Sequence, residues 1–376
     1  MIFQTLDDKS ECIRVYTDGQ LHFNSIPDNL TTTWKYSGSL SNSEVEFVGL
    51  WTNGLDLEDC CPEQYATELK QCRNKLEAYL KSFKIAKINM RDHCIFDMIP
   101  QDFLMRFCEV KNKITEHVKK TWKRPDNYKH LADVSVLLHK IKYQNLNLST
   151  QDCRHLLTSS RDRDKAKTLI SNYRQIDYNL FGTVTGRLTT RPSSFPILTL
   201  RKDLRQMIKP QNDLFVCLDY NGAEVRTLLE LCGEEQPNID IHKWNSQHLF
   251  EQDPTSTDIT SDHYDRKKVL DNWYEDGYIS TPYGRKIQVE ERKALNYLLQ
   301  STTSDRVLSK AVKIDTFLIE NNCKSYISHI VHDEIVLDYS DGDRKWIPQI
   351  KEIFEDGYPC NLTAGKDYYN LKELKI

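Results

Sequence analysis

Short runs of alternating apolar and polar residues open the chain and predict strands. We expect these strands at Met1–Thr5, Cys12–Tyr16 and Leu21–Asn24. Asp18-Gly19 lies between the last two and is typical of a hairpin turn. The apolar residues then change to helical spacing. Helices are expected at Glu63–Phe83, Phe103–Lys120, Tyr128–Ile141 and Arg161–Tyr173.

From about residue 176 the pattern mixes strands and helices with many polar residues between them. Leu214–Asp219 predicts a short apolar strand that ends in a carboxylate. Ala223–Leu231 predicts a helix that stops at Gly233. A long helix is expected over Glu290–Glu320. Ser325–Leu337 predicts a β pair that His332-Asp333-Glu334 interrupts at its middle.

Composition and charge limit the function classes only mildly. The 376 residues allow two or three domains, and 39% hydrophobic residues are enough for real cores. With a net charge of -4, a nucleic-acid binder has to concentrate its Lys and Arg locally. The most basic cluster consists of Lys111, Lys113, Lys119, Lys120, Lys123 and Arg124. A solvated helix face is the commoner explanation for such a run, and a phosphate-tracking surface is the alternative.

Eleven Cys are scattered along the chain without a CxxC pair. The odd count, the lack of a signal-peptide pattern and the lack of a bilayer-length apolar run predict a reducing, cytoplasmic setting. We therefore expect most of these cysteines to be small buried apolar residues.

Two acidic patterns point to chemistry. Asp219 ends a predicted strand, and Asp333-Glu334 lie at the tip of a predicted β pair. Taken alone, Asp219 is better explained by a plain turn or a helix cap, and Asp333-Glu334 fit either a charged hairpin turn or a metal site. Together, two strand-end Asp residues suit a pair of Mg²⁺ ions, because Mg²⁺ prefers oxygen ligands.

A polar stripe on the long helix forms the third pattern. Arg292, Asn296 and Gln300 recur every four residues and share one helix face. Long hydrogen-bonding side chains in such a stripe suit contacts to minor-groove acceptors and sugars. A solvated stripe is the alternative for this helix by itself.

Together the three patterns resemble family A DNA polymerases, the DNA polymerase I type, and especially their phage versions. Asp219–Arg226 is similar to motif A, and His332-Asp333-Glu334 is similar to motif C. Thr185-Gly186-Arg187-Leu188 resembles the TGRL element that opens the palm, and Tyr283-Gly284-Arg285 resembles the turn before the long helix. The five motifs occur in the family's order over roughly half of the chain.

The resemblance implies an α+β fold with a right-hand palm, in which helices cover an antiparallel sheet. It divides the chain into a small N-terminal αβ domain (1–95), a helical thumb-like region (96–178), and a palm with truncated fingers (179–376). The truncated fingers would occupy residues 243–282.

The resemblance also implies roles for single residues. Asp219 and Asp333 would bind two catalytic Mg²⁺ ions, and Glu334 would lie beside them. Glu224 would be the steric gate that favours deoxynucleotides. The other implied nucleotide-binding residues are Tyr220, Arg266 and Lys267, and the implied DNA-binding residues are Arg187, Arg292, Asn296, Gln300 and His332.

The implied activity is template-directed DNA synthesis from dNTPs onto a primer 3′-hydroxyl, in phage-type replication within an infected host cell. The implied partners are primer-template DNA, dNTPs and phage replication proteins. A membrane is not among the implied partners.

Two regions depart from the family pattern. Between His242 and Tyr283 only about forty residues are available for the fingers, including the loop-like run Asp253–Asp258. Either the nucleotide-gripping helix is missing, or Arg266-Lys267-Lys268 is a shortened substitute. If the helix is missing, the protein binds primer-template without efficient extension, because electrostatic stabilisation is usually the largest catalytic contribution. An RNA polymerase of the single-subunit type is a further alternative, which Glu224 at the gate position disfavours.

The N-terminal region lacks the Asp-x-Glu pattern of a proofreading exonuclease. The nearest candidates, Asp7, Asp8 and Asp97, do not form it. We therefore expect residues 1–95 to be a relic without exonuclease activity.

Overall fold

The computed structural model describes residues 1–40, 44–151, 158–173, 175–241, 244 and 266–375. The chain divides into two compact units, Met1–Lys140 and Ile141–Ile376. The three-part division at residues 95 and 178 stays a prediction. The run Asp253–Asp258 and most of the expected fingers interval lie outside the described residues.

The first unit begins with the predicted three-stranded antiparallel sheet. Its strands are β1 (Phe3–Thr5), β2 (Arg14–Thr17) and β3 (Gln20–Phe23). Asp18 and Gly19 both have positive φ, 48° and 74°, as the predicted two-residue hairpin turn requires. A short parallel pair, β4 (Thr32–Thr33) and β5 (Glu46–Phe47), follows.

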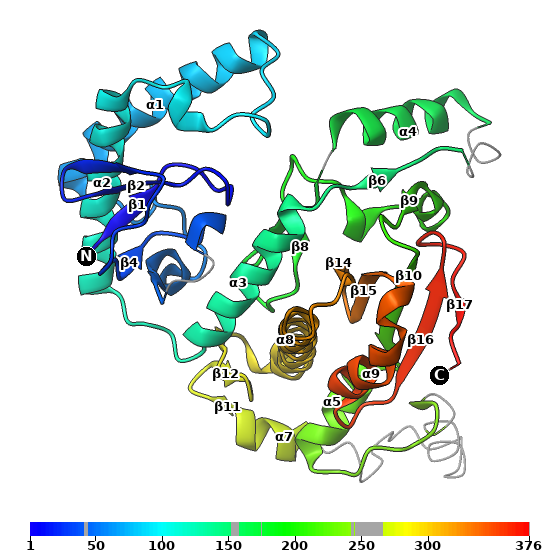
Figure 1. Ribbon diagram of the computed structural model, residues 1–376. Helices are drawn as coiled ribbons and strands as arrows, with labels where there is room; N and C mark the ends of the chain where they lie inside the picture. The colour runs from blue at the N-terminus through cyan, green and yellow to red at the C-terminus, as the bar shows by residue number, and fades with distance from the viewer. Residues whose placement is uncertain (41–43, 152–157, 174, 242–243, 245–265, 376) are drawn as a thin grey trace. The chain divides into compact units, whose positions relative to one another are not determined.

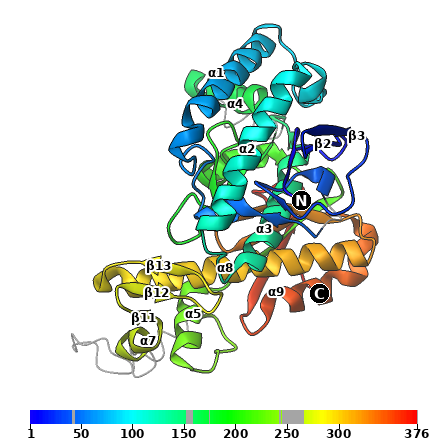
Figure 2. The same cartoon turned by 90° about the vertical axis from the view of Figure 1, so that its left-hand side faces the viewer.

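The predicted helices follow. They are α1 (Glu63–Ile85), α2 (Gln101–Thr121) and α3 (Tyr128–Tyr143), the last of which ends three residues into the second unit. Three 3₁₀ turns accompany them: η1 (Gly38–Leu40) between β4 and β5, η2 (Val48–Thr52) before α1, and η3 (Ile95–Asp97) before α2. Figure 2 shows α1 and α2 side by side. Leu69 of α1 and Val110, Ile114 and Val118 of α2 form one buried cluster. The helices therefore bury the apolar faces that their spacing predicted.

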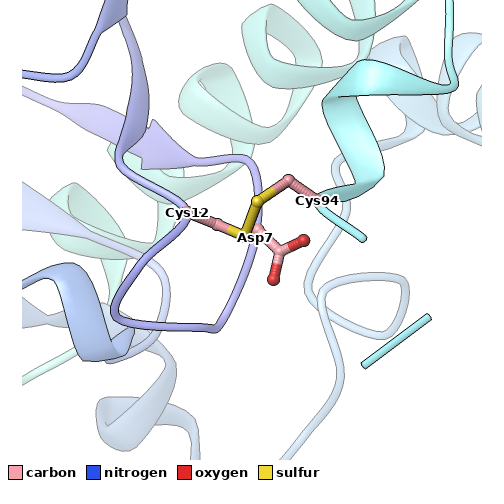
Figure 3. Close-up of side chains that lie close together, drawn as sticks. All are labelled: Asp7, Cys12 and Cys94. Carbon is pink, nitrogen blue, oxygen red and sulfur yellow. A yellow bond between two sulfur atoms is a disulfide. The ribbon is translucent and has the colours of Figure 1, made fainter. Parts of the chain in front are cut away.

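A disulfide joins Cys12 to Cys94 across a sequence separation of 82 (Figure 3). The Asp7 carboxylate lies beside it and accepts hydrogen bonds from Lys9 Nζ (2.8 Å) and the Ile95 N–H (2.9 Å). Ligand atoms of Asp7, Cys12 and Cys94 lie within 4.8 Å of one another. Because these sulfurs are bonded to each other and Lys9 neutralises Asp7, the group does not have the free thiolates that a metal site needs.

The expectation that the cysteines are unpaired is wrong for this pair. Its physical reason is tertiary, because the chain brings the β1–β2 connection against the segment between α1 and α2. Cys72, Cys108 and Cys217 are free and buried, as predicted.

Five of the six residues in the basic cluster of α2 and the following turn, all except Lys111, form ion pairs with neighbouring carboxylates. The ion pairs are Lys113–Glu109, Lys119–Glu46, Lys120–Glu116, Lys123–Asp126 and Arg124–Glu46. Such pairing supports a solvated, salt-bridged face rather than a phosphate-tracking surface.

The second unit is built on a five-stranded antiparallel sheet. In spatial order its strands are β14 (Tyr326–Val331), β15 (Glu334–Tyr339), β10 (Leu214–Tyr220), β16 (Cys360–Gly365) and β17 (Lys372–Glu373). Side chains along a strand alternate between the two faces of a sheet. Asp219 therefore lies on the opposite face from Leu218 and Tyr220.

Helices cover the face that carries Leu218 and Tyr220. These helices are α5 (Ala223–Cys232), α8 (Glu291–Glu320) and α9 (Ile347–Glu355). Figure 1 shows α8 and α9 packed beside the sheet. The Tyr220 ring stacks on Phe354 of α9, with 4.1 Å between ring centroids. The opposite face carries Asp219.

A small helix and sheet adjoin the first turns of α8. They are α7 (Arg266–Trp273) and the antiparallel strands β11 (Tyr274–Glu275), β12 (Tyr278–Ser280) and β13 (Lys286–Gln288). Figure 2 shows them gathered at the N-terminal end of α8. Val269 and Leu270 of α7 pack with Leu231 of α5 and Leu298 of α8.

The other elements of this unit are short. They are α4 (Ser160–Asn172), the pairs β6 (Asn147–Leu148) with β9 (Ile208–Lys209) and β7 (Tyr178–Asn179) with β8 (Thr189–Thr190), and the 3₁₀ turns η5 (Ile197–Thr199), η6 (Lys202–Met207) and η7 (Asp341–Trp346). Among the helices that the structure describes, none combines the length and apolar character that crossing a bilayer requires.

Candidate polymerase active site

Two acidic side chains face each other across neighbouring strands. Asp219 of β10 is directly opposite Glu334 of β15 and, on its other side, Asn361 of β16. Directly opposed residues have Cβ atoms about 4.5–5.5 Å apart. Register therefore places two carboxylates and an amide in one row on the face opposite these helices.

Asp333 lies in the two-residue turn between β14 and β15. Val331 pairs with Glu334, so His332 and Asp333 form the whole turn. His332 has a φ of 58°, a conformation that costs a non-glycine residue energy. Tyr178 holds the strand that leads into the turn. Its buried hydroxyl donates to Ile330 O (2.6 Å) and accepts from Ile330 N (3.0 Å).

The acidic row is electrostatically unfavourable without a cation. Burial, followed by the charges of Asp333 and Glu334, raises the pKa of Asp219 to about 7. Burial also raises the pKa of Glu334, against hydrogen bonds from Tyr368 and Cys217 that lower it. Carboxylates that repel one another in this way are stabilised by a bound cation.

Five predicted residues line one cavity of about 250 Å³ next to the turn. They are Arg187, Glu224, Gln300, His332 and Asp333, together with Leu188, Gly222, Ala223, Val225, Thr303, Ser304, Leu308 and Ile330. Arg187 and Glu224 form an ion pair at this cavity. Arg187 and His332, which are 145 positions apart in the chain, thus line the same cavity, where the sequence predicted a DNA and nucleotide site.

Glu224 is positioned by the loop that starts α5. Gly222 precedes the helix with a φ of 69°, and a Cβ there would approach Ile241 Cγ2 to 2.3 Å. Arg226, which is fully buried, donates to the carbonyl oxygens of Asn221 (2.8 Å), Pro237 (3.0 Å) and Ile239 (2.9 Å). Arg226 therefore fixes the loops around the first turn of α5 instead of facing the cavity.

A buried ion pair joins the three elements around Arg187. Arg285 Nε donates to Asp305 Oδ2 (2.8 Å) and its Nη2 donates to Oδ1 (2.6 Å). Gly186 packs against this guanidinium, since a Cβ at Gly186 would lie 2.5 Å from Arg285 Cζ. The Ser304 hydroxyl donates to Gly186 O (2.9 Å). These contacts hold three segments in fixed positions relative to one another: the loop 185–188, the turn 283–285 and α8.

The polar stripe of α8 has the predicted geometry. Gln300 Nε2 donates to Asn296 Oδ1 (3.2 Å), so these two side chains share one face. Arg292 is exposed and pairs with Glu290 (2.7 Å). Gln300 lines the cavity, and Arg292 and Asn296 continue the stripe towards the N-terminal end of the helix.

The structure does not bring Tyr220 to the cavity, although the sequence assigned it to the nucleotide. Its side chain is buried under α9, and its hydroxyl donates to Phe354 O. Strand alternation is the reason, because Tyr220 follows Asp219 and must point to the other face.

The structure does not bring Arg266 and Lys267 to the acidic residues either. Both begin α7, and Lys268 Nζ donates to the Cys232 carbonyl at the C-terminal end of α5 (2.8 Å). Glu224 lies eight residues earlier on α5, about 12 Å along the helix axis. In the part of the chain that the structure describes, Arg266 and Lys267 lie at the N-terminal end of α7, and Lys268 binds the C-terminal end of α5.

Sequence reasoning missed several residues of the site. A second cavity, of about 710 Å³, is lined by Asp219, Glu334, Lys351, Cys360, Asn361, Leu362, Thr363, Glu373, Leu374 and Lys375. Asn361 lies in the acidic row, and Tyr368 Oη donates to Glu334 Oε2 (2.6 Å). The weak signal available was the polar content of β16, which could not specify these contacts.

Curated relatives of this chain are bacterial DNA polymerases. DNA polymerase I of Chloroflexus aurantiacus is 22% identical over 226 residues, which is 42% of this chain and 24% of the relative. The thermostable DNA polymerase I of Thermus aquaticus is 22% identical over 271 residues, 52% of this chain and 32% of the relative. The chain thus spans between about a quarter and a third of the length of these relatives. No family model matches it.

A solved structure agrees with this similarity. The POL domain of Pol1 from M. smegmatis, in complex with DNA primer-template and dNTP, superposes with a TM-score of 0.51 at 14% identity. The match covers 71% of this chain and 76% of that domain. The predicted α+β polymerase fold is therefore confirmed, and the chain is a distant relative of bacterial DNA polymerase I.

Proposed function

We propose that this protein carries out template-directed DNA synthesis, adding dNTPs to a primer 3′-hydroxyl. One observation carries the proposal: the acidic row of Asp219 and Glu334 ends beside Asp333, next to a cavity lined by Arg187, Glu224, Gln300 and His332. The five sequence motifs account for these positions in the order of the family. The similarity to DNA polymerase I supports DNA synthesis in general.

Asp219 and Asp333 would hold two Mg²⁺ ions, with Glu334 beside them. The donor set fits, because all three are carboxylates, and burial followed by the charges of Asp333 and Glu334 raises the pKa of Asp219. When bound, the ions would activate the 3′-hydroxyl and stabilise the leaving pyrophosphate. The chain's own contribution is to hold the carboxylates on two rigid strands and a constrained turn.

The cavity residues would orient the substrates. Glu224 would exclude a ribose 2′-hydroxyl, and its ion pair with Arg187 holds the carboxylate in place. Arg187, Arg292, Asn296 and Gln300 would contact primer and template through sugars and minor-groove acceptors. His332 would lie near the primer terminus. Glu224 also disfavours the alternative of an RNA polymerase.

A second candidate is a protein that binds primer-template without efficient extension. It is favoured by the position of α7, whose Lys268 caps α5 and whose Arg266 reaches the Glu291 carbonyl (3.4 Å). If these cations do not grip the triphosphate, the transition-state charge rests on the acidic site alone. Losing one such donor costs on the order of 10²–10³ in rate.

The biological setting is also part of the proposal. A shortened fingers region and the motif set fit a phage-type enzyme that works in the cytoplasm of an infected host cell. Its partners would be primer-template DNA, dNTPs and phage replication proteins.

Primer extension with Mg²⁺ separates the two candidates. Extension that Asp219→Ala abolishes would support the enzyme. Salt-dependent primer-template binding with no dNTP incorporation, even at high protein concentration, would favour the binding protein. Failure to bind or extend would contradict both.

A further inference from the structure

Tyr368 contacts Glu334 through its hydroxyl group, on the face of the sheet opposite Tyr220. Only 1% of its surface is exposed, and its hydroxyl donates to Glu334 Oε2 at 2.6 Å. This distance is in the range of a hydrogen bond to an ionised carboxylate. One oxygen of Glu334 is therefore already engaged by the protein.

The backbone of Tyr368 is fixed by a tight turn after β16. The Asp367 carboxylate accepts hydrogen bonds from the N–H groups of Tyr369 (2.9 Å) and Asn370 (2.7 Å). The Tyr368 N–H donates to Ile208 O (3.3 Å). A side chain on such a turn has a defined direction before any ligand binds.

The ring of Tyr368 is enclosed on two sides. Arg205 Cζ lies 4.8 Å from its centroid, and the His329 ring meets it edge-on at 4.6 Å. Arg205 Nη1 also donates to the Tyr368 hydroxyl (3.4 Å). The hydroxyl accepts from a cation and donates to a carboxylate, an arrangement that strengthens both hydrogen bonds.

We propose that Tyr368 is a positioning residue for the metal-binding row: it holds Oε2 of Glu334 and so orients this carboxylate towards a cation beside Asp219. This inference rests on the proposed function. Glu334 and Asp219 are already opposite each other in register, so only the side-chain torsions of Glu334 remain to be fixed. The Tyr368 hydroxyl fixes them by engaging one carboxylate oxygen.

Tyr368→Phe tests the proposal, because it removes the hydroxyl and keeps the ring. Tyr369→Phe is the matched control, since Tyr369 is the next residue and 40% exposed. Mn²⁺ binding, measured by paramagnetic resonance, should weaken about 10–100-fold in Tyr368→Phe, as is typical for partners of metal ligands, and stay unchanged in the control. In primer extension, the Mg²⁺ concentration for half-maximal rate should rise by a similar factor.

A double-mutant cycle with Glu334→Gln distinguishes positioning from a general structural role. If Tyr368 acts through Glu334, Tyr368→Phe has little further effect on Mn²⁺ binding in the Glu334→Gln background. Additive losses in the double variant would overturn the proposal. Unchanged Mn²⁺ binding in Tyr368→Phe would also overturn it. So would a result in which Asp219→Asn binds Mn²⁺ as tightly as the wild-type protein. A wild-type protein that binds Mn²⁺ through Asp219 but extends no primer would refute the proposed polymerase activity alone, because the binding cycle still tests Tyr368.

Discussion

Arg285 and Asp305 form a bidentate ion pair in which the Asp305 side chain is completely buried. The pair joins the turn before α8 to the middle of that helix, and Gly186 packs on the guanidinium. A buried pair of this kind contributes more to keeping elements in place than to net stability, because burying the charges offsets much of their attraction.

Removing one partner should be strongly destabilising. Asp305→Asn leaves the buried Arg285 without its counter-charge, so we expect the free energy of unfolding to fall by about 3–5 kcal/mol. Urea unfolding followed by circular dichroism measures this. The double variant Arg285→Met/Asp305→Leu should be closer to wild type. A change under about 0.5 kcal/mol in Asp305→Asn would contradict the importance of the pair.

Reduction of the Cys12–Cys94 disulfide should destabilise the first unit. Opening a cross-link with a sequence separation of 82 typically costs about 2–5 kcal/mol. We expect a lower urea midpoint in reductant and two additional titratable thiols after reduction. The variant Cys12→Ser/Cys94→Ser is the control, since its midpoint should not respond to reductant. Equal midpoints for wild type in both conditions would show that the bond does not stabilise the fold.

Stability without metal should depend on the ionisation of Asp219. Its pKa of about 7 in the folded chain is above the ordinary value of Asp, so the folded state binds the proton more tightly than the unfolded state. Stability should therefore fall as the pH rises from about 4 to about 7 in EDTA, by about 1–2 kcal/mol after allowance for solvent screening. Asp219→Asn should flatten this dependence. A wild-type profile that rises with pH over this window, relative to Asp219→Asn, would contradict the assignment.

Divalent cations should compete with that proton. Because the ligand must be ionised, Mg²⁺ affinity should increase as the pH rises through about 7, and binding should release protons. Calorimetry in buffers of different ionisation enthalpy measures the released protons. No release near pH 6.5 would mean that Asp219 is already ionised or is not a ligand.

Glu224→Ala should relax sugar selection. Removing the side chain opens space in the cavity, and we expect ribonucleotide incorporation relative to deoxynucleotide incorporation to rise on the order of 10–10²-fold. Glu320→Ala, at the exposed end of α8, is the control. If Glu224→Ala selects deoxynucleotides over ribonucleotides as strongly as the wild-type protein, Glu224 is not the steric gate.

Lys268→Met tests whether the basic start of α7 replaces a fingers helix. Because Lys268 binds the carbonyl end of α5, we expect a loss of about 0.5–1 kcal/mol in stability and an unchanged KM for dNTP. A tenfold or larger rise in KM with unchanged stability would instead support direct triphosphate binding.

The local elements were predictable because their signals are local. The Asp18-Gly19 turn, the helix Ala223–Cys232 with Gly233 after it, and the hairpin around His332 all depend on near neighbours. The position of Tyr220 was also available from strand alternation, because adjacent strand residues point to opposite faces. The sequence resemblance placed it with the nucleotide instead.

Contacts between distant segments were not predictable in the same way. Tyr368 and Glu334 are 34 positions apart, and their hydrogen bond depends on the turn after β16. The Cys12–Cys94 pairing depends on how a loop between two helices reaches the first sheet. No spacing rule connects either pair.

The register of β10 with β15 has a consequence for how the gene can change. Inserting or deleting one residue within β10 would exchange its two faces, turning Asp219 towards α9 and Leu218 to the face that carries Glu334. A substitution in this strand changes the packing of one side chain. An insertion or deletion of one codon would instead take Asp219 out of the acidic row. Length variation in this unit is therefore expected in the connections between strands, with the strand itself constant in length.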